Sequence, residues 1–148
     1  MTSSPPSPSP SPSSFADVVA ITQVVAAYGP AVDCGDSAAV ADLFTEDGWY
    51  DVAGRRYTGR AEIAAMVEGK AHQSLLAEGV AHVMGLPRVT VDGDRAVAVN
   101  QSVVHRKGEV WRVAANRWEL VRTPAGWKVT SRVNRLLDGS QEARDLLR

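Results

Sequence analysis

Residues 96–136, AVAVNQSVVHRKGEVWRVAANRWELVRTPAGWKVTSRVNRL, decide the fold of this chain. Apolar and polar residues alternate in this stretch, and alternation predicts strands, because successive side chains of a strand point to opposite faces. Lys107-Gly108 and the TPAG segment at 123–126 are turn sequences that join antiparallel neighbours. We therefore expect an antiparallel meander, one face of which must be covered by helices. The three expected strands cover residues 96–106, 109–122 and 127–136.

The N-terminal half supplies those helices. Apolar residues recur every three or four positions from Phe15 onward, which predicts an amphipathic helix, and Gly29-Pro30 should kink its last turn. Two more helices are expected at 38–44 and 60–76, with a hairpin over 49–59 between them. The residues that form the stripe of the first helix are Val18, Ile21, Val25 and Tyr28.

The order of these elements gives the fold class. After Gly79 the apolar period changes to two, VDGD at 91–94 is a turn, and residues 140–148 form a short closing helix. We expect an α+β fold in which a cone-shaped, curved antiparallel or mixed sheet wraps around three N-terminal helices, as in a cystatin-like α+β barrel. Such a cone leaves a pocket between its concave face and the helices.

Composition limits the function. The chain has 148 residues, a net charge of −1 and a pI near 6.3, which argues against nucleic acid or an anionic membrane as partner. One cysteine excludes an internal disulfide and fits a cytoplasmic location. The Ser/Pro-rich residues 1–14 predict a disordered tail without a signal sequence, and residues 15–148 form the domain. No stretch of about 18 apolar residues suggests a membrane span.

Several segments together resemble the SnoaL-like branch of the nuclear transport factor 2-like superfamily, which includes scytalone dehydratase, lindane dehydrochlorinase and bile acid dehydratase. The resemblance covers about residues 15–138. It implies the cone fold, a hydrophobic small-molecule ligand and a homodimer or homotrimer, whereas the fold by itself implies no particular reaction. The matching segments are YGPAVDCGD, ADLFTEDG, GRAEIAAM, AHVMGLPRVTVDGDRA and AANRWELVRTPAGWKV.

The resemblance also implies a catalytic site. The His–Asp dyad of those enzymes falls on Asp33 and His82, their polar first-helix position on Tyr28, and their last-strand arginine on Arg132. A neutral imidazole can accept a proton, a carboxylate on its other nitrogen fixes the tautomer, and Tyr and Arg can stabilise a developing negative oxygen. We expect a dehydratase, cyclase or isomerase acting on a hydrophobic cyclic molecule such as a polyketide, steroid or aromatic precursor. That chemistry needs no cofactor or metal, and the three histidines lack ligand spacing.

The sequence also allows other roles for these residues. Asp33 can instead cap the loop that follows it, and His82 can be a structural histidine with satisfied hydrogen bonds. A ketosteroid-isomerase-like alternative pairs Tyr28 with Asp51 as the proton shuttle, and a third possibility is a non-catalytic ligand-binding or dimerisation module. Three further residues on the inner faces of the strands are candidates for substrate binding: Asn100, Asn116 and Trp118.

Overall fold

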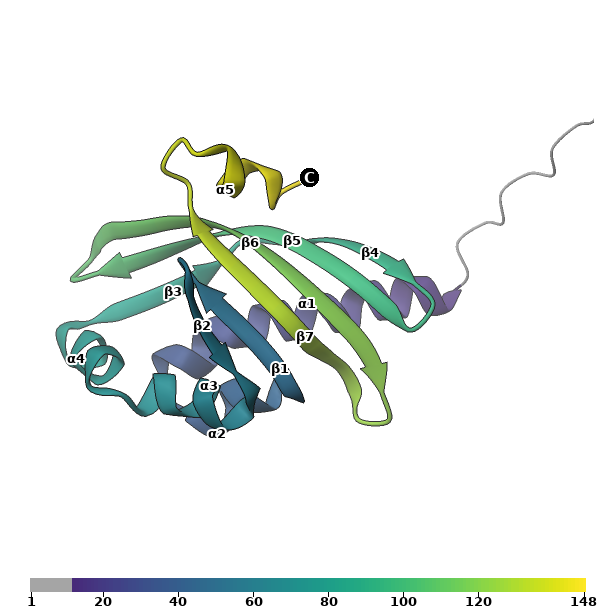
Figure 1. Ribbon diagram of the computed structural model, residues 1–148, viewed down its shortest axis with the longest axis horizontal. Coiled ribbons are helices and arrows are strands. Elements are labelled where there is room, and N and C mark those ends of the chain that lie inside the picture. Colours follow the sequence, from purple (N-terminus) through teal and green to yellow (C-terminus); the bar gives the residue numbers. More distant parts are fainter. Residues whose placement is uncertain (1–11) are drawn as a thin grey trace, which may run out of the picture.

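The computed structural model describes residues 12–148, and Figure 1 shows their arrangement. The helices are α1 (Pro12–Asp33), α2 (Ser37–Asp42), α3 (Gly59–Glu68), α4 (Lys70–Glu78) and α5 (Gln141–Asp145). The strands are β1 (Phe44–Val52), β2 (Arg55–Thr58), β3 (Val80–Met84), β4 (Arg88–Asp92), β5 (Arg95–Arg106), β6 (Glu109–Thr123) and β7 (Gly126–Leu136).

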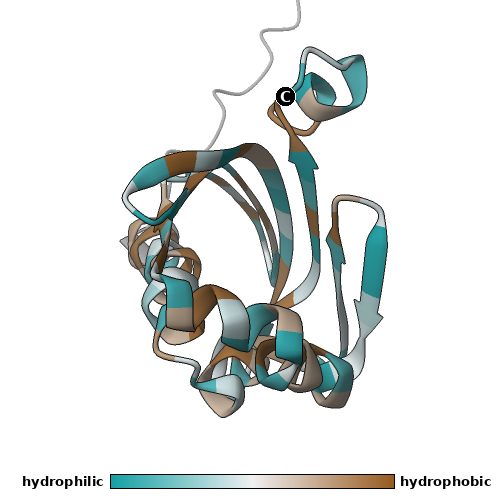
Figure 2. Cartoon of the chain, turned by 90° about the vertical axis from the view of Figure 1, so that its left-hand side faces the viewer, coloured by the Kyte–Doolittle hydropathy of each residue, from teal (hydrophilic) through white to brown (hydrophobic). Residues whose placement is uncertain are grey.

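The strands form one curved sheet in the order β2-β1-β7-β6-β5-β3, and β4 also pairs with β5. The β1–β7 pair is parallel, whereas every other pair is antiparallel, so the sheet is mixed. Figure 2 shows helices α1 to α4 on the concave side of the sheet and α5 on its outer side. The expected α+β fold, with a curved sheet wrapped around N-terminal helices, is confirmed.

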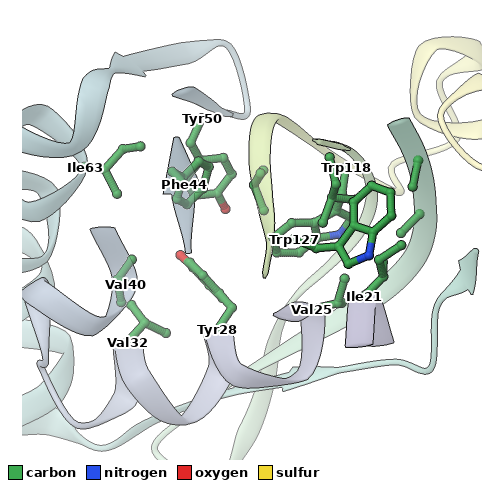
Figure 3. Packing of buried hydrophobic residues seen from close by; sticks show 14 of the residues in the cluster. Ile21, Val25, Tyr28, Val32, Val40, Phe44, Tyr50, Ile63, Trp118 and Trp127 are labelled. Atoms are coloured by element: carbon green, nitrogen blue, oxygen red, sulfur yellow. The ribbon is translucent and has the colours of Figure 1, made fainter. Parts of the chain in front are cut away.

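The core lies between α1 and the concave face of the sheet (Figure 3). Ile21, Val25 and Tyr28 of the α1 stripe are buried there together with Trp118 and Trp127, as the spacing of the stripe requires, whereas Val18 is half-buried. Contrary to expectation, one stretch, Phe15–Asp33, is long and apolar enough to cross a membrane. In the folded domain this helix instead packs its apolar stripe, which includes Ile21 and Val25, into the core.

Two helix boundaries differ from the sequence prediction. The second helix ends at Asp42, and Phe44 begins β1, where it is fully buried and pairs with Val129 of β7. The helix expected over 60–76 is divided at Gly69, whose backbone is extended, so α3 and α4 run in different directions. In both places pairing or backbone conformation overrides the local helical pattern.

The first helix is longer than its apolar stripe. It begins at Pro12, three residues before Phe15, and continues through Pro30 to Asp33. The backbone N–H of Cys34 donates to the Pro30 carbonyl at 2.9 Å, so the helical hydrogen-bond pattern extends past the proline. The rest of the expected tail, residues 1–11, lies outside the described residues.

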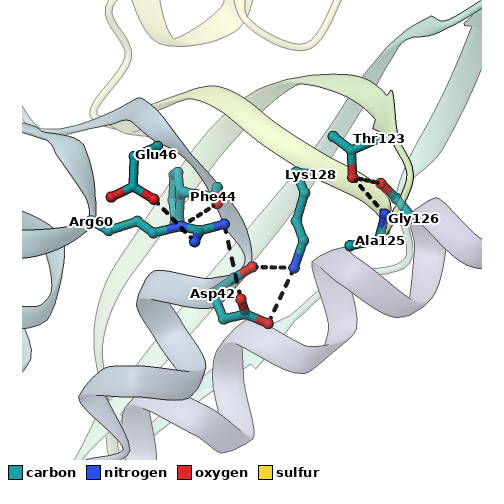
Figure 4. Close-up of polar contacts among 8 residues, drawn as sticks. All are labelled: Asp42, Phe44, Glu46, Arg60, Thr123, Ala125, Gly126 and Lys128. Atoms are coloured by element: carbon teal, nitrogen blue, oxygen red, sulfur yellow. Dashed lines mark hydrogen bonds and ion pairs between the residues drawn. The ribbon is translucent and has the colours of Figure 1, made fainter.

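Polar contacts fasten the start of β1 to its neighbours (Figure 4). The Lys128 ammonium on β7 donates to the Asp42 backbone carbonyl at 2.6 Å, which satisfies a carbonyl at the end of α2. The Arg60 Nε on α3 donates to the Phe44 carbonyl at 2.9 Å, at the first residue of β1. Lys128 thus joins β7 to the end of α2, and Arg60 joins α3 to the start of β1.

A close backbone approach joins α1 to β3. A Cβ placed on Gly29 would lie 2.3 Å from the backbone carbonyl oxygen of His82, which is far inside van der Waals contact. Only glycine allows the helix to lie this near the strand. The position of His82 relative to the end of α1 therefore depends on Gly29.

We expect Gly29→Ala to destabilise the protein by about 1–3 kcal/mol, because helix and strand must separate to admit the methyl group. The measurement is urea denaturation. The control is Ala26→Ser, which adds one atom at an exposed position of the same helix and should change stability by less than about 0.5 kcal/mol. Equal midpoints for wild type and Gly29→Ala would contradict the close approach.

The other end of α1 is held by Asp17. Its carboxylate accepts hydrogen bonds from Arg122 Nη1 at 2.6 Å and Nη2 at 2.8 Å, and from the Trp127 indole at 3.0 Å. The Arg122 hydrogen bonds, and then that of Trp127, lower the pKa of Asp17 to about 2 from an ordinary value of 3.8. The contact therefore stabilises the fold above pH 3.8 and loses that contribution as pH falls toward 2.

We expect Asp17→Asn to lower the free energy of unfolding at neutral pH, and the difference from wild type to shrink between pH about 4 and 2. Denaturant unfolding at several pH values tests this. Asp94→Asn is the matched control, since Asp94 also pairs with Arg122 but is 81% exposed; its effect should be small. If the difference in unfolding free energy between wild type and Asp17→Asn grew as pH fell, the carboxylate would not be stabilised in the folded state.

Candidate active site

A cavity of about 250 Å³ lies between the concave face of the sheet and helices α1, α3 and α4. Aliphatic side chains such as Val32, Met66 and Leu75 form much of its wall. A polar group gathers among them, drawn from five different elements. Its members are Tyr28 on α1, Tyr50 on β1, His72 on α4, His82 on β3, and Arg132 and Asn134 on β7.

The structure places Asp33 against His82. The His82 ring Nδ1 lies 2.6 Å from Asp33 Oδ1, and the His82 backbone N–H donates to Asp33 Oδ2 at 2.7 Å. Because a carboxylate only accepts, Nδ1 carries the proton and Nε2 is the unprotonated nitrogen of the neutral ring. His82 lines the cavity, and Asp33 lies behind it.

The environment of His82 favours the neutral imidazole. Burial lowers the pKa of His82 below its ordinary 6.5, while the hydrogen bond and charge of Asp33 act in the opposite direction. The positive charge of Arg132 lowers this pKa further. The ring is therefore mainly neutral at pH 7, which is the form that accepts a proton.

Tyr28 lies beside the Asp33–His82 pair. Its ring centroid is 6.3 Å from that of His82 and 5.9 Å from that of Tyr50, both in edge-to-face geometry. Burial raises the pKa of Tyr28 far above its ordinary range, the Tyr50 phenol adds to this, and Arg132 opposes it. The hydroxyl therefore stays protonated and can donate a hydrogen bond at any working pH.

Arg132 lies in the floor of the cavity and is only 2% exposed. Its guanidinium carbon lies 4.1 Å, 4.4 Å and 4.0 Å from the ring centroids of Tyr28, Tyr50 and Trp118. Asn116 Oδ1 accepts hydrogen bonds from Arg132 Nη2 at 2.8 Å and from Nε at 3.2 Å. Aromatic faces and an amide thus fix the position of a buried positive charge.

The three residues expected to bind substrate do not line the cavity, and this corrects the sequence prediction. Asn116 and Trp118 lie on the inner face of the sheet, as expected, but Arg132 covers them. Asn100 accepts a hydrogen bond from the Trp118 indole at 2.9 Å and donates one to the Gly85 carbonyl at 2.9 Å. All three support the residues that form the cavity floor.

The position of Asp51 argues against the isomerase-like alternative. It follows the cavity residue Tyr50 on β1, so its side chain points to the opposite face of the sheet. There it pairs with Arg135, with Nη1 at 2.7 Å from Oδ1, and accepts the Gly54 backbone N–H at 2.8 Å. The Arg135 hydrogen bond lowers the pKa of Asp51. This carboxylate is therefore a structural ion pair outside the cavity.

Sequence reasoning missed Tyr50, His72 and Asn134. His72 Nε2 donates to the Val32 carbonyl at 2.8 Å, and its ring centroid is 6.1 Å from that of His82, although ten residues separate the two histidines in the chain. Because Tyr50 alternates with Asp51 along the strand, the strand pattern could have revealed Tyr50 as a cavity residue. Among residues 12–148, no group of three His, Cys, Asp or Glu side chains has an arrangement that could hold a metal ion.

We expect Asp33→Asn to lower the pKa of His82, because the negative charge that raises it is lost, although the amide oxygen can still accept the ring N–H. An NMR pH titration of the His82 ring measures this. Asp36→Asn is the matched control: it removes the same charge three residues away and keeps an acceptor at the N-cap of α2. Equal midpoints in wild type and Asp33→Asn would refute the contact.

Several solved protein structures share this fold. An NTF2-like protein with a cystatin-like fold from Novosphingobium aromaticivorans superposes with a TM-score of 0.88, with 47% identity over 90% of each chain. ActVI-ORFA from Streptomyces coelicolor is 21% identical, with a TM-score of 0.71 over 85% of this chain and 98% of that chain. An NTF2-like family protein from Streptomyces avermitilis is 19% identical, with a TM-score of 0.67 over 83% and 97%.

Sequence comparison identifies the family. No curated protein sequence matches the chain significantly. The SnoaL-like domain matches residues 13–133, which include every member of the Tyr28, Asp33, His82 and Arg132 set. Since the match spans most of the chain, the protein belongs to the SnoaL-like domain family.

Proposed function

We propose that this protein is an enzyme that abstracts a proton next to a carbonyl group of a cyclic small molecule, in a dehydration, cyclisation or isomerisation. The observation that carries the proposal is the Asp33–His82 hydrogen bond at the cavity wall. A carboxylate behind a histidine, with the free ring nitrogen available to the cavity, is the arrangement of a general base. Side chains of this chain suffice for the step.

Proton transfer to His82 begins the reaction. The neutral Nε2 takes the proton from the carbon, and the electron pair of that C–H bond moves into the carbonyl to form an enolate. Asp33 stabilises the imidazolium that results, because their contact becomes an ion pair at 2.6 Å. The Tyr28 hydroxyl donates to the enolate oxygen, and Arg132 contributes its positive charge to the same region.

The fate of the enolate distinguishes the reactions. In a dehydration the enolate oxygen re-forms the carbonyl, and the electrons of the enolate double bond form a double bond to the next carbon, whose hydroxyl leaves as water with the proton from His82. In an isomerisation His82 returns the proton to a different carbon. Either course regenerates neutral His82, so the dyad turns over.

We expect the protein to exchange the α-hydrogens of a suitable cyclic ketone with solvent deuterium, and His82→Gln to reduce the rate by about 10²–10⁴-fold. The measurement is proton NMR in D₂O with a panel of cyclic ketones and β-hydroxy ketones. His105→Gln is the matched control, since His105 on β5 does not line the cavity. Its exchange rate should equal that of wild type.

The pH profile of the same exchange gives a second readout. The base must be neutral to react, and its pKa is lowered, so kcat/KM should fall only below pH 6.5. Equal exchange by wild type and His82→Gln would refute the dyad. Binding of the ketones without any exchange would favour a non-catalytic ligand-binding module instead.

A further inference from the structure

Arg132 is a buried cation without an anionic partner. Among residues 12–148, no carboxylate oxygen lies within 4.0 Å of its guanidinium nitrogens, and its hydrogen bonds go to a neutral amide, Asn116. Its Nη1 is buried and has no hydrogen-bond partner in the described part of the chain. Burial of an unpaired charge is costly, and proteins normally avoid it by pairing.

The surroundings of Arg132 stabilise its charge but do not neutralise it. Three aromatic faces, from Tyr28, Tyr50 and Trp118, lie within 4.4 Å of its guanidinium carbon. Cation–π contacts leave the net charge of +1 in place. By contrast, Arg122 and Arg135, which are more exposed, each pair with an aspartate. In the described part of the chain, the buried positive charge of Arg132 therefore has no negative partner, although burial makes such a partner most valuable there.

The cavity sets the size and character of what can compensate this charge. Arg132 lines its floor, and Val32, Met66 and Leu75 lie among the aliphatic residues of the wall. The volume of about 250 Å³ is below the range of about 300–1,000 Å³ that is usual for ligand pockets. An occupant that fits is compact and apolar, with one anionic group at the end that meets Arg132.

We propose that the substrate is a compact cyclic or aromatic carboxylic acid, bound as its anion with the carboxylate directed toward Arg132. This rests on the proposed function, since it takes the same cavity as the substrate site. The carboxylate brings a negative charge into the cavity that Arg132 lines, and this charge offsets the buried guanidinium. Arg132 then binds the substrate carboxylate in place of stabilising the enolate, and the Tyr28 hydroxyl alone donates to the carbonyl oxygen at the reacting centre.

Binding of benzoate and benzamide tests the inference, because the two have nearly the same shape and differ in charge. Isothermal titration calorimetry at pH about 8 keeps His82 neutral and benzoate ionised. We expect wild type to bind benzoate at least about tenfold more tightly than benzamide. Equal affinities, tighter binding of benzamide, or no binding of benzoate would overturn the proposal.

Two variants locate the charge that benzoate recognises. Asn116→Asp places a carboxylate of the same shape at Arg132 Nη2, and Arg132→Met removes the charge; both should abolish the preference for benzoate. Asn116→Asp keeps the arginine and its aromatic contacts, so it tests the proposal even where Arg132→Met fails to fold. Arg117→Met is the control, at an arginine of β6 that does not line the cavity. Loss of the preference in Arg117→Met, or its retention in Asn116→Asp, would overturn the proposal.

His82→Gln separates this inference from the proposed function. The variant should lose proton exchange and should still prefer benzoate to benzamide, because Arg132 remains in place. Lost exchange in His82→Gln, with no preference for benzoate in wild type, would overturn the carboxylate assignment and leave the dyad intact. Normal exchange in His82→Gln, with a clear preference for benzoate that Asn116→Asp abolishes, would overturn the dyad and support the anion site.

Discussion

At the end of helix α1, one carboxylate accepts two hydrogen bonds from a single residue of strand β3. Asp33 receives the backbone N–H of His82 and also the N–H of its ring. Strand β3 ends the sheet order, so the outward N–H groups of this strand need partners that no neighbouring strand provides. Gly29 lets the helix lie close enough for this contact. The same carboxylate thus closes an exposed sheet edge and orients the candidate base, and a change that moved α1 would disturb both.

Behind the cavity, asparagines on three adjacent strands take the place of hydrophobic residues. Asn116 Oδ1 accepts N–H groups from Arg132 and Asn134, its amide donates to Ser102 Oγ, and Asn100 bonds the Trp118 indole. Such a buried network is costly unless each member is satisfied, and once satisfied it favours a single arrangement. Here the arrangement holds the Trp118 ring centroid 4.0 Å from the guanidinium carbon of Arg132. The inner face of the sheet therefore gives up part of its apolar packing and holds one charged side chain in a fixed position.

Sequence patterns predicted these features unequally. Alternation predicted the three long strands and placed Asn116 and Trp118 on the inner face, but it gives no depth, so it could not show that Arg132 covers both residues. At β1, the isomerase-like alternative pointed to Asp51, but its neighbour Tyr50 lines the cavity, because successive residues of a strand face opposite sides of the sheet. The contact between Asp33 and His82 was accessible through resemblance alone, because 49 residues separate them and their geometry depends on a tertiary approach.

The charges of Asp33 and Arg132 shift the pKa of His82 in opposite directions. Asp33 raises the pKa of the imidazole and Arg132 lowers it, while burial lowers it most. The balance favours a neutral ring, which is ready to accept a proton but is only weakly basic. An anion bound beside Arg132 would offset the positive potential of the guanidinium at His82 and would make the ring more basic. A substrate carboxylate would therefore do more than pair with Arg132: it would also make His82 more basic once the substrate is bound. A buried arginine without an internal counter-ion permits this coupling, whereas an internal carboxylate would fix the basicity of His82 before the substrate arrived.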